Sequence, residues 1–178
     1  MKRSNELKEI LKIEFSLYFS HMSEFRKAKL LRNETFYIWS YVKLLRRCEY
    51  YKNHNKRLLY FFNERRRNKL GLKLGFAIPL NVFGKGLKIY HMGSIIVNPR
   101  AKVGENCVLH VMNCIGNKGD GYDGAPKVGN NVKIGMGAII IGDIMIADDC
   151  VIGANSVVLR SYNNKGKVLV GSPAIEKR

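Results

Sequence analysis

The sequence predicts a left-handed parallel β-helix preceded by an α-helical region, and three observations support this. Apolar residues recur at helical spacing up to about residue 70, glycine becomes frequent after Gly75, and β-branched residues then recur every six positions. A period of six suits neither an α-helix nor an alternating strand, but it suits a chain that turns a corner every six residues. We expect a basic helical region over residues 1–75 and the β-helix over residues 76–178.

The helical region shows amphipathic periodicity in residues 7–18 and again in residues 36–46. Asn33 or Ser4 would serve as helix N-caps, because a short polar side chain accepts a hydrogen bond from a free backbone N–H of the first turn. We expect about three helices here. Aromatic residues are dense in this region, which supplies a large burial area against another layer or another subunit.

The hexad repeat places one apolar residue inside the coil every six positions, with two interruptions. One interruption is a two-residue bulge around Gly93, and the other is the loop 117–127. A second, mostly small residue recurs four positions after each inward residue, as tight triangular corners require. Three hexads make one coil, so about four coils are expected. The inward series is Phe83, Ile89, Val97, Val103, Leu109, Ile115, Val128, Ile134, Ile140, Ile146, Ile152 and Val158, and the second series is Leu87, Ala101, Cys107, Asn113, Val132, Ala138, Ile144, Cys150 and Ser156.

Charge is concentrated in the helical region. The formal net charge is +17, and residues 1–75 carry +12 of it. Such a field attracts nucleic acid, an anionic membrane surface or an anionic substrate, and charge alone does not choose between them.

The location predicted from composition is cytoplasmic. No stretch approaches the roughly 20 apolar residues of a membrane span, and the opening residues MKRSNELKEILKIEF contain acids where a signal peptide would be apolar. The four cysteines, Cys48, Cys107, Cys114 and Cys150, show no CxxC spacing, so we expect free thiols and no metal site.

Four segments of the repeat region stand out in their order and spacing: IYHMGSIIVNPRAKVGENCVLH, APKVGNNVKIGMGAIIIGD, ADDCVIGANSVVLRS and VGSPA. Together they resemble the hexapeptide acyltransferases of the serine acetyltransferase type, including relatives associated with polysaccharide O-acetylation. The resemblance covers roughly residues 77–175. It implies acetyl-CoA as the donor, a homotrimer or a dimer of trimers, and active sites in clefts between neighbouring β-helices.

Acetyl transfer to an alcohol needs a base near neutral pH, and histidine fits best. His91 occupies the position of the family's catalytic histidine. Leu109 stands one coil beyond Ile89, so His110 should stack beneath Tyr90 and beside His91. We expect His91 to act as the general base and His110 to bind or orient the substrate.

The donor site is also implied by the resemblance. Gly and Ala allow close approach of a thin pantetheine arm, and basic side chains would meet the phosphates. The expected acetyl-CoA contacts are Asn117, Lys133, Gly135, Met136, Gly153, Ala154, Arg160, Gly171, Ser172 and Pro173, with Lys165 and Lys167 as further phosphate contacts.

The acceptor is predicted from three departures from the family. Serine acetyltransferases carry acids at the positions of Tyr90 and Phe76 and a histidine at the position of Ala125. All three changes touch recognition of serine or its alignment, so we expect a sugar hydroxyl of a capsule, lipopolysaccharide or similar glycan precursor. The expected acceptor contacts are Tyr90, Asn113, Asp120, Tyr122 and Asp123.

Two alternatives stay open at this point. One is a serine O-acetyltransferase of cysteine biosynthesis with altered site residues. The other is a non-catalytic β-helix scaffold whose basic helices bind nucleic acid or a membrane, although no RNA- or DNA-reading motif is present. We favour helices that cap the β-helix, mediate trimer contacts and rest peripherally on the inner membrane near lipid-linked glycans, without binding nucleic acid.

Overall fold

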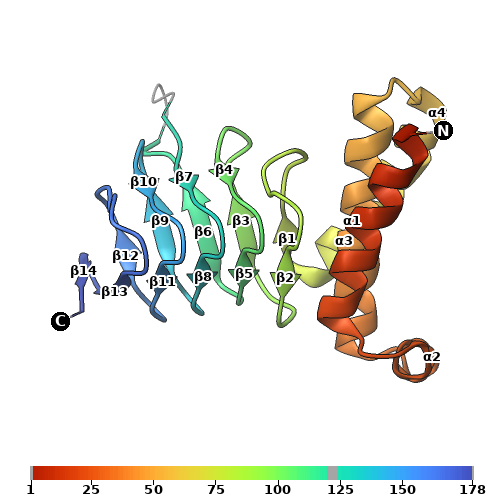
Figure 1. Ribbon diagram of the computed structural model, residues 1–178, viewed down its shortest axis with the longest axis horizontal. Helices are drawn as coiled ribbons and strands as arrows, with labels where there is room; N and C mark the ends of the chain where they lie inside the picture. Colours follow the sequence, from red (N-terminus) through yellow and green to blue (C-terminus); the bar gives the residue numbers. More distant parts are fainter. Residues whose placement is uncertain (1, 120–123, 178) are drawn as a thin grey trace.

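The computed structural model of the chain describes residues 2–119 and 124–177, and of residues 2–5 the backbone alone. Figure 1 shows a group of helices that carries the N-terminus, and beside it a column of short strands that runs to the C-terminus. The helices are α1 (Lys2–Tyr18), α2 (Met22–Leu31), α3 (Glu34–Asn53) and α4 (Arg57–Leu74).

Four helices are present among the described residues, where the sequence predicted about three. The additional helix is α2, which begins after His21, a residue with extended backbone. No glycine or proline marks this break in the sequence. Asn33 caps α3 as predicted, because its side chain accepts a hydrogen bond from the Phe36 N–H at 3.0 Å. Ser4 instead lies within α1.

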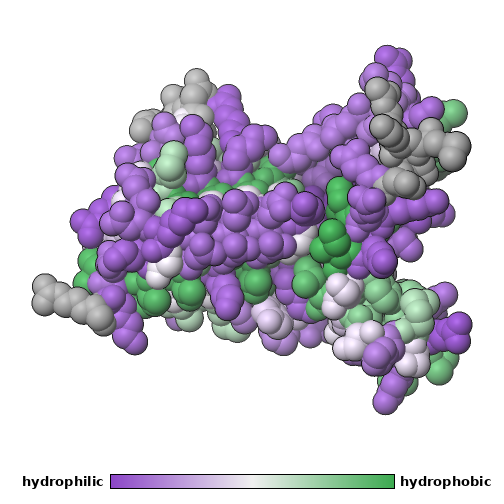
Figure 2. All heavy atoms as spheres, in the orientation of Figure 1, coloured by the Kyte–Doolittle hydropathy of each residue, from purple (hydrophilic) through white to green (hydrophobic). Residues whose placement is uncertain are grey.

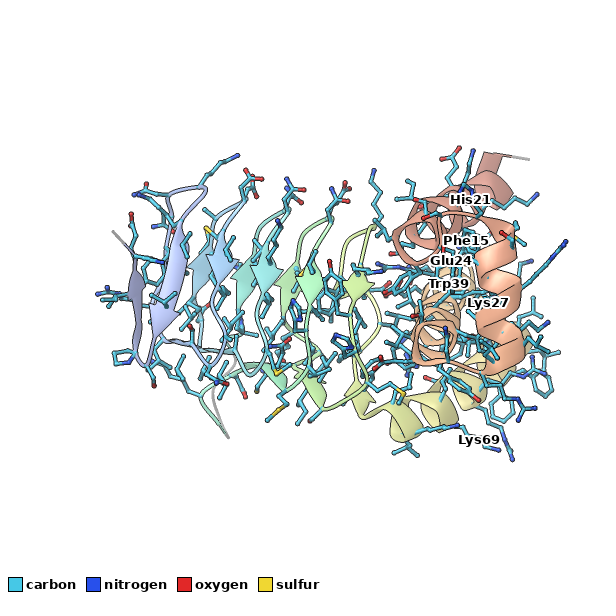
Figure 3. All side chains as sticks on the ribbon, turned by 90° about the horizontal axis from the view of Figure 1, so that it is seen from below. Phe15, His21, Glu24, Lys27, Trp39 and Lys69 are labelled. Atoms are coloured by element: carbon cyan, nitrogen blue, oxygen red, sulfur yellow. The ribbon has the colours of Figure 1, made fainter. Side chains whose placement is uncertain are left out.

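Aromatic packing holds the helices together. Phe15 on α1 contacts the Trp39 ring on α3 edge-on at 5.6 Å, and it contacts Phe25 on α2 at 5.7 Å. Phe15 and Trp39 lie inside the helical region in Figure 3. These contacts explain the density of aromatic residues in the first 75 positions.

Three sheets form the walls of a triangular coil. We call these walls sheet A, sheet B and sheet C. Every pairing is parallel except that of the last strand, β14, which runs antiparallel to β13. Sheet A contains β1 (Phe76–Ala77), β3 (Ile95–Val97), β6 (Asn113–Gly116), β9 (Ile139–Ile141) and β12 (Val157–Val158); sheet B contains β4 (Lys102–Val103), β7 (Lys127–Val128) and β10 (Met145–Ile146); sheet C contains β2 (Lys88–Ile89), β5 (Val108–Leu109), β8 (Lys133–Ile134), β11 (Val151–Ile152), β13 (Val168–Gly171) and β14 (Ala174–Glu176).

The core of the β-helix is the predicted repeat. All twelve residues of the inward series are at most 5% exposed, and all nine of the second series are buried. Phe76 and Leu169 extend the buried column beyond the predicted limits. Burial of each such side chain contributes about 1.5–3 kcal/mol relative to leaving it in water.

Glycines that directly follow the inward residues allow neighbouring coils to approach closely. A Cβ at Gly135 would lie 2.7 Å from the Ala154 backbone nitrogen, so glycine there allows coil to stack on coil. Some corners also place asparagines in the left-handed conformation, such as Asn106 with φ 56° and Asn131 with φ 57°.

A buried ionic cluster joins the helices to the first coil. Arg46 on α3 bonds Glu14 on α1 at 2.8 Å and Glu49 at 2.9 Å, and it donates to the carbonyls of Phe83 and Gly84. The cluster fixes α1 and α3 against the first coil of the β-helix.

The outer faces of the sheets differ in character. On sheet A one ladder of outward residues, matched in register, is entirely apolar: Ala77, Ile96, Cys114, Ile139 and Val157. The corresponding outward positions of sheet B include Lys102 and Lys127. The face of the β-helix turned toward the viewer in Figure 2 is mainly hydrophilic. Among the described residues, none of the helices combines the length and apolar character of a membrane span.

Candidate active site

The turn from sheet C to sheet A, which we call the C–A corner, gathers most of the predicted site residues. Each coil contributes the residue that follows its inward sheet C position, and register places these residues one above another. The column runs Tyr90, His110, Gly135, Gly153. His91, Met136 and Ala154 are the next residues along the chain at this corner. The two predicted histidines and the predicted donor glycines therefore share one edge of the molecule.

His91 is held by a carboxylate from the helical region. Its Nδ1 lies 3.2 Å from Oε2 of Glu34, the first residue of α3, and Oε1 of the same carboxylate accepts the backbone N–H of Met92 at 2.5 Å. The His91 side chain is 56% exposed. Its Nε2 makes no hydrogen bond to the residues that the structure describes, so this nitrogen is open to a substrate.

His110 stacks on Tyr90, as the repeat predicted. The ring centroids are 4.8 Å apart and the rings are inclined by 18°. Tyr90 also lies near His91, with centroids 6.4 Å apart. Both imidazoles thus lie near the Tyr90 ring, and within the described part of the chain no hydrogen bond joins them.

A pocket of about 500 Å³ opens beside His91, between the helices and β2. Its polar wall includes Glu24, Lys27 and Glu34 from the helices and Lys88 from β2. Lys88 places its ammonium 4.2 Å from the centre of the Tyr18 ring and donates to the Leu17 carbonyl, and burial lowers its pKa. Glu24 and Lys27 are labelled on α2 in Figure 3. The pocket offers both signs of charge next to the imidazole.

Small residues continue the C–A corner away from the histidines. Gly135 and Gly153 stack through a hydrogen bond from the Gly135 N–H to the Ile152 carbonyl, and Ala154 beside them is exposed. Farther along, Gly171 at the end of β13 and Ser172 and Pro173 in the turn to β14 are exposed, and the Gly171 N–H donates to Ser156 Oγ at 3.2 Å. Lys133 also lies nearby, exposed on the outer face of sheet C.

Two predicted donor residues lie at a different corner, the turn from sheet A to sheet B. Asn117 follows β6 and Arg160 follows β12, each two residues past its inward position. Arg160 donates from Nε to the Tyr162 hydroxyl at 3.0 Å. The strands of sheet A separate this A–B corner from His91 within one chain. Asp120, Tyr122 and Asp123 lie outside the described residues.

Asn113 does not face the pocket beside His91. It is 2% exposed, and its Nδ2 donates to the Gly135 carbonyl at 2.7 Å. The hexad repeat had already placed this residue in an inward position, and the structure follows the repeat. Asn113 therefore supports the backbone of the C–A corner from inside, and the expectation of a direct substrate contact is corrected.

The four cysteines are free thiols, as predicted, and Cys48, Cys107 and Cys150 are buried. Burial raises the pKa of the Cys107 thiol to about 12 and that of Cys48 to about 11. A thiol with so high a pKa is a poor nucleophile near neutral pH.

Sequence reasoning missed the helical side of the site. Glu34 is 57 positions from His91, and the pocket residues Lys27 and Lys88 come from separate elements. The one signal in the sequence was Asn33, because an N-cap at this position predicts a helix whose first turn contains Glu34.

The comparisons with known proteins agree with this architecture. Residues 125–160 match the family described as bacterial transferase hexapeptide, six repeats. Together with the solved relatives, this match defines the class: a left-handed β-helix of hexapeptide repeats with N-terminal helices.

The particular relatives are acetyltransferases. Serine acetyltransferase of Helicobacter pylori (strain ATCC 700392 / 26695) is 34% identical over 93 residues, which is 51% of this chain and 53% of that protein. The putative colanic acid biosynthesis acetyltransferase WcaB of Escherichia coli (strain K12) is 31% identical over 86 residues, 48% of this chain and 53% of that protein. The chain spans about half the length of these relatives.

Solved structures extend the likeness into the helices. The soybean serine acetyltransferase apoenzyme is 26% identical with a TM-score of 0.63, over 80% of this chain and 57% of that one. The Brucella abortus strain S19 serine acetyltransferase in complex with coenzyme A is 21% identical with a TM-score of 0.72, over 97% and 68%, which shows the fold. The resemblance to hexapeptide acyltransferases of the serine acetyltransferase type is therefore confirmed.

Proposed function

We propose that the chain is an acetyl-CoA-dependent O-acetyltransferase in which His91 is the general base. The observation that carries this proposal is His91 itself, held through Nδ1 with Nε2 open, at the end of a corner of small residues. Nε2 of His91 takes the proton of the acceptor hydroxyl while the hydroxyl oxygen attacks the carbonyl carbon of the acetyl group. The carbon–sulfur bond then breaks, and the imidazolium returns the proton to the CoA thiolate.

The donor would lie along the C–A corner. Gly135 and Gly153 leave room for the pantetheine arm, Met136 and Ala154 flank it, and the segment Gly171 to Pro173 closes the far end. The sulfur end would point toward His91 and the phosphates toward Lys133. The coenzyme A complex of the Brucella relative supports this choice of donor.

A homotrimer would complete the site. The apolar ladder of sheet A is the face that a second copy would cover, since an exposed apolar patch marks an interaction surface. Packing through sheet A brings the C–A corner of one copy beside the A–B corner of its neighbour. Asn117 and Arg160 would then reach the donor of the adjacent chain, which explains why one chain keeps them apart from His91.

We infer that the acceptor is a sugar hydroxyl of a surface polysaccharide precursor. The pocket beside His91 is larger than an amino acid requires, and Tyr90, which is 48% exposed, offers aromatic surface at the edge of the pocket against which a sugar ring can pack. Phe76 and Ala125, at family acid and histidine positions, are both buried. The WcaB relative, a putative colanic acid biosynthesis enzyme, points the same way.

A serine O-acetyltransferase is the second candidate. The relatives above are mostly serine acetyltransferases, and the mixed charges of Glu24 and Lys27 in the pocket would suit the ammonium and carboxylate of a zwitterion. The two candidates share the donor, the base and the chemistry and differ only in the acceptor.

Release of the CoA thiol separates these candidates. Purified protein with acetyl-CoA is assayed against L-serine and against a panel of glycan precursors, with His91→Ala in parallel. The first candidate predicts turnover with a glycan and a loss of about 10²- to 10⁴-fold in His91→Ala. Turnover on L-serine alone would assign the second candidate, and unchanged activity in His91→Ala would refute the base.

The chain would act in the cytoplasm, at the membrane face where lipid-linked glycans are built. The outer side of α4 carries Leu58, Phe61 and Phe62, which are 57–76% exposed, on a helix with six basic residues and one acidic residue. Apolar side chains among cations suit an anionic bilayer surface. Sedimentation with phosphatidylglycerol vesicles, but not with phosphatidylcholine vesicles, would support this location, and loss of the difference in a Phe61→Ser, Phe62→Ser variant would assign it to α4.

A further inference from the structure

We propose that Glu34 is the residue that positions His91, so that the helical region supplies the carboxylate of the catalytic pair. The inference rests on the proposed function of His91 and extends it to a second element. Glu34 holds both the ring and the backbone of the site segment, with Oε2 3.2 Å from His91 Nδ1 and Oε1 bonded to the Met92 N–H.

The position of Glu34 is itself fixed by the fold. It is the first residue of α3, whose start is set by the Asn33 cap on the Phe36 N–H. Ile38 and Trp39, one turn farther along α3, are at most 4% exposed. Because α3 cannot shift against β2 without disturbing this core, the carboxylate is presented to His91 in one place.

Glu34 would be a favourable residue at this place even without a histidine, because an acid stabilises the first turn of a helix. That role needs no contact outside α3. In the structure the two oxygens of the Glu34 carboxylate instead contact His91 and Met92, which are 57 and 58 positions away in the sequence. The contact therefore requires an explanation in the site and not only in the helix.

The bond to Nδ1 selects the useful form of the imidazole. A neutral imidazole that donates its Nδ1–H to Glu34 has its lone pair on Nε2, which faces the acceptor hydroxyl. When Nε2 takes the proton, the carboxylate lies beside the positive ring and stabilises it, without itself taking a proton. Glu34 thus acts on orientation, tautomer and charge together.

No other acid does this in the described part of the chain. Tyr90 and Phe76 stand where the resembled family has acids; Tyr90 stacks on His110, and the Phe76 ring packs on Tyr41 at 5.1 Å. Glu34 is the one described acid whose carboxylate lies within hydrogen-bond distance of the His91 ring. In this chain the helical region therefore supplies the carboxylate that the resembled family carries in its β-helix.

The test compares Glu34→Gln, Glu34→Ala and Glu34→Asp with a control, Glu105→Gln. Glu105 is likewise an exposed acid in an ion pair, with Lys85 at 3.4 Å, but it does not line the pocket beside His91. Loss of a buried aspartate behind a catalytic histidine costs about 10⁴-fold in kcat. Glu34 is 38% exposed, so we expect a fall of about 10- to 100-fold for Gln and Ala, partial recovery for Asp, and KM for acetyl-CoA within about twofold.

A second measurement does not depend on knowing the acceptor. Protein labelled with ¹⁵N-histidine, assigned with a His91→Asn variant, should show His91 with its proton on Nδ1, and a mixture of tautomers in Glu34→Ala. Wild-type kcat together with an unchanged tautomer in Glu34→Ala would overturn the proposal while leaving His91 as base. Full activity in His91→Ala would instead refute the proposed function.

Discussion

Arg46 on α3 and Glu14 on α1 form a buried ion pair at the point where the helices meet the β-helix. Glu14 is fully buried, and one of its oxygens also accepts the backbone N–H groups of Gly86 and Leu87. Arg46 in turn donates to Glu49 and to two carbonyls of the first coil. The pair therefore connects two helices and a β-turn through a single guanidinium.

Removal of Arg46 should destabilise the protein strongly. In Arg46→Met the Glu14 carboxylate stays buried without its cation, so we expect a loss of about 3–5 kcal/mol in the free energy of unfolding. Denaturant unfolding at one fixed protein concentration measures it. The control is Lys85→Met, which breaks an exposed pair with Glu105 and should cost at most about 1 kcal/mol. Equal effects of the two substitutions would contradict this account of the junction.

Charge on the outer face of sheet A should break the proposed trimer. Ile96 is 54% exposed in the single chain and is the second residue of the apolar ladder. We expect Ile96→Glu to reduce the mass measured by light scattering to that of a monomer, because an unpaired charge cannot be buried in an apolar contact. Activity should fall with it, since the proposed site is completed by a second copy. Lys127→Glu on sheet B is the control and should leave the mass unchanged.

A large side chain at Ala154 should block the donor. Ala154 is exposed at the C–A corner, so Ala154→Phe would fill the path proposed for the pantetheine arm. The expected result is a rise in KM for acetyl-CoA of about tenfold or more, equivalent to at least about 1.4 kcal/mol of lost binding, with an unchanged unfolding midpoint. Asn163→Phe introduces the same ring in an exposed loop beyond β12 and should leave KM unaltered. A normal KM in Ala154→Phe would move the donor to another surface.

The thiols should react slowly in the folded protein. Burial raises the pKa of Cys107 to about 12 and that of Cys48 to about 11, so at pH 8 only a very small fraction of each is thiolate. Cys150 is buried as well. Titration with a disulfide reagent at pH 8 should therefore detect at most one reactive thiol, that of Cys114, in the native protein and four in denaturant. Rapid native reaction that survives in Cys114→Ser would contradict the burial of the other three.

The β-helix could be predicted in detail because its pattern is local. Each inward residue, from Phe83 to Val158, is fixed by its distance along the chain from the last one, and all twelve are buried. The helical region was predicted less well. The break before α2 arises at His21 from tertiary packing and has no glycine or proline to announce it.

The site divides in the same way. The stacking of His110 on Tyr90 followed from counting coils, because register converts sequence distance into contact. Glu34 could not be found in this manner, since its approach to His91 depends on how α3 packs against the β-helix. Asn113 shows a different error. The repeat assigned this residue to the interior, where the structure has it, but it was predicted to contact the acceptor because its side chain is polar.

A stack of parallel strands has an open rung at each end, on which another chain could polymerise. Here the helices cover the end of the stack at the first coil. The backbone N–H groups of Gly86 and Leu87 donate to the Glu14 carboxylate, and that of Ile89 donates to the Tyr18 hydroxyl. The same contacts that place the helices beside the candidate site thus also keep this end of the strand stack from pairing with another chain.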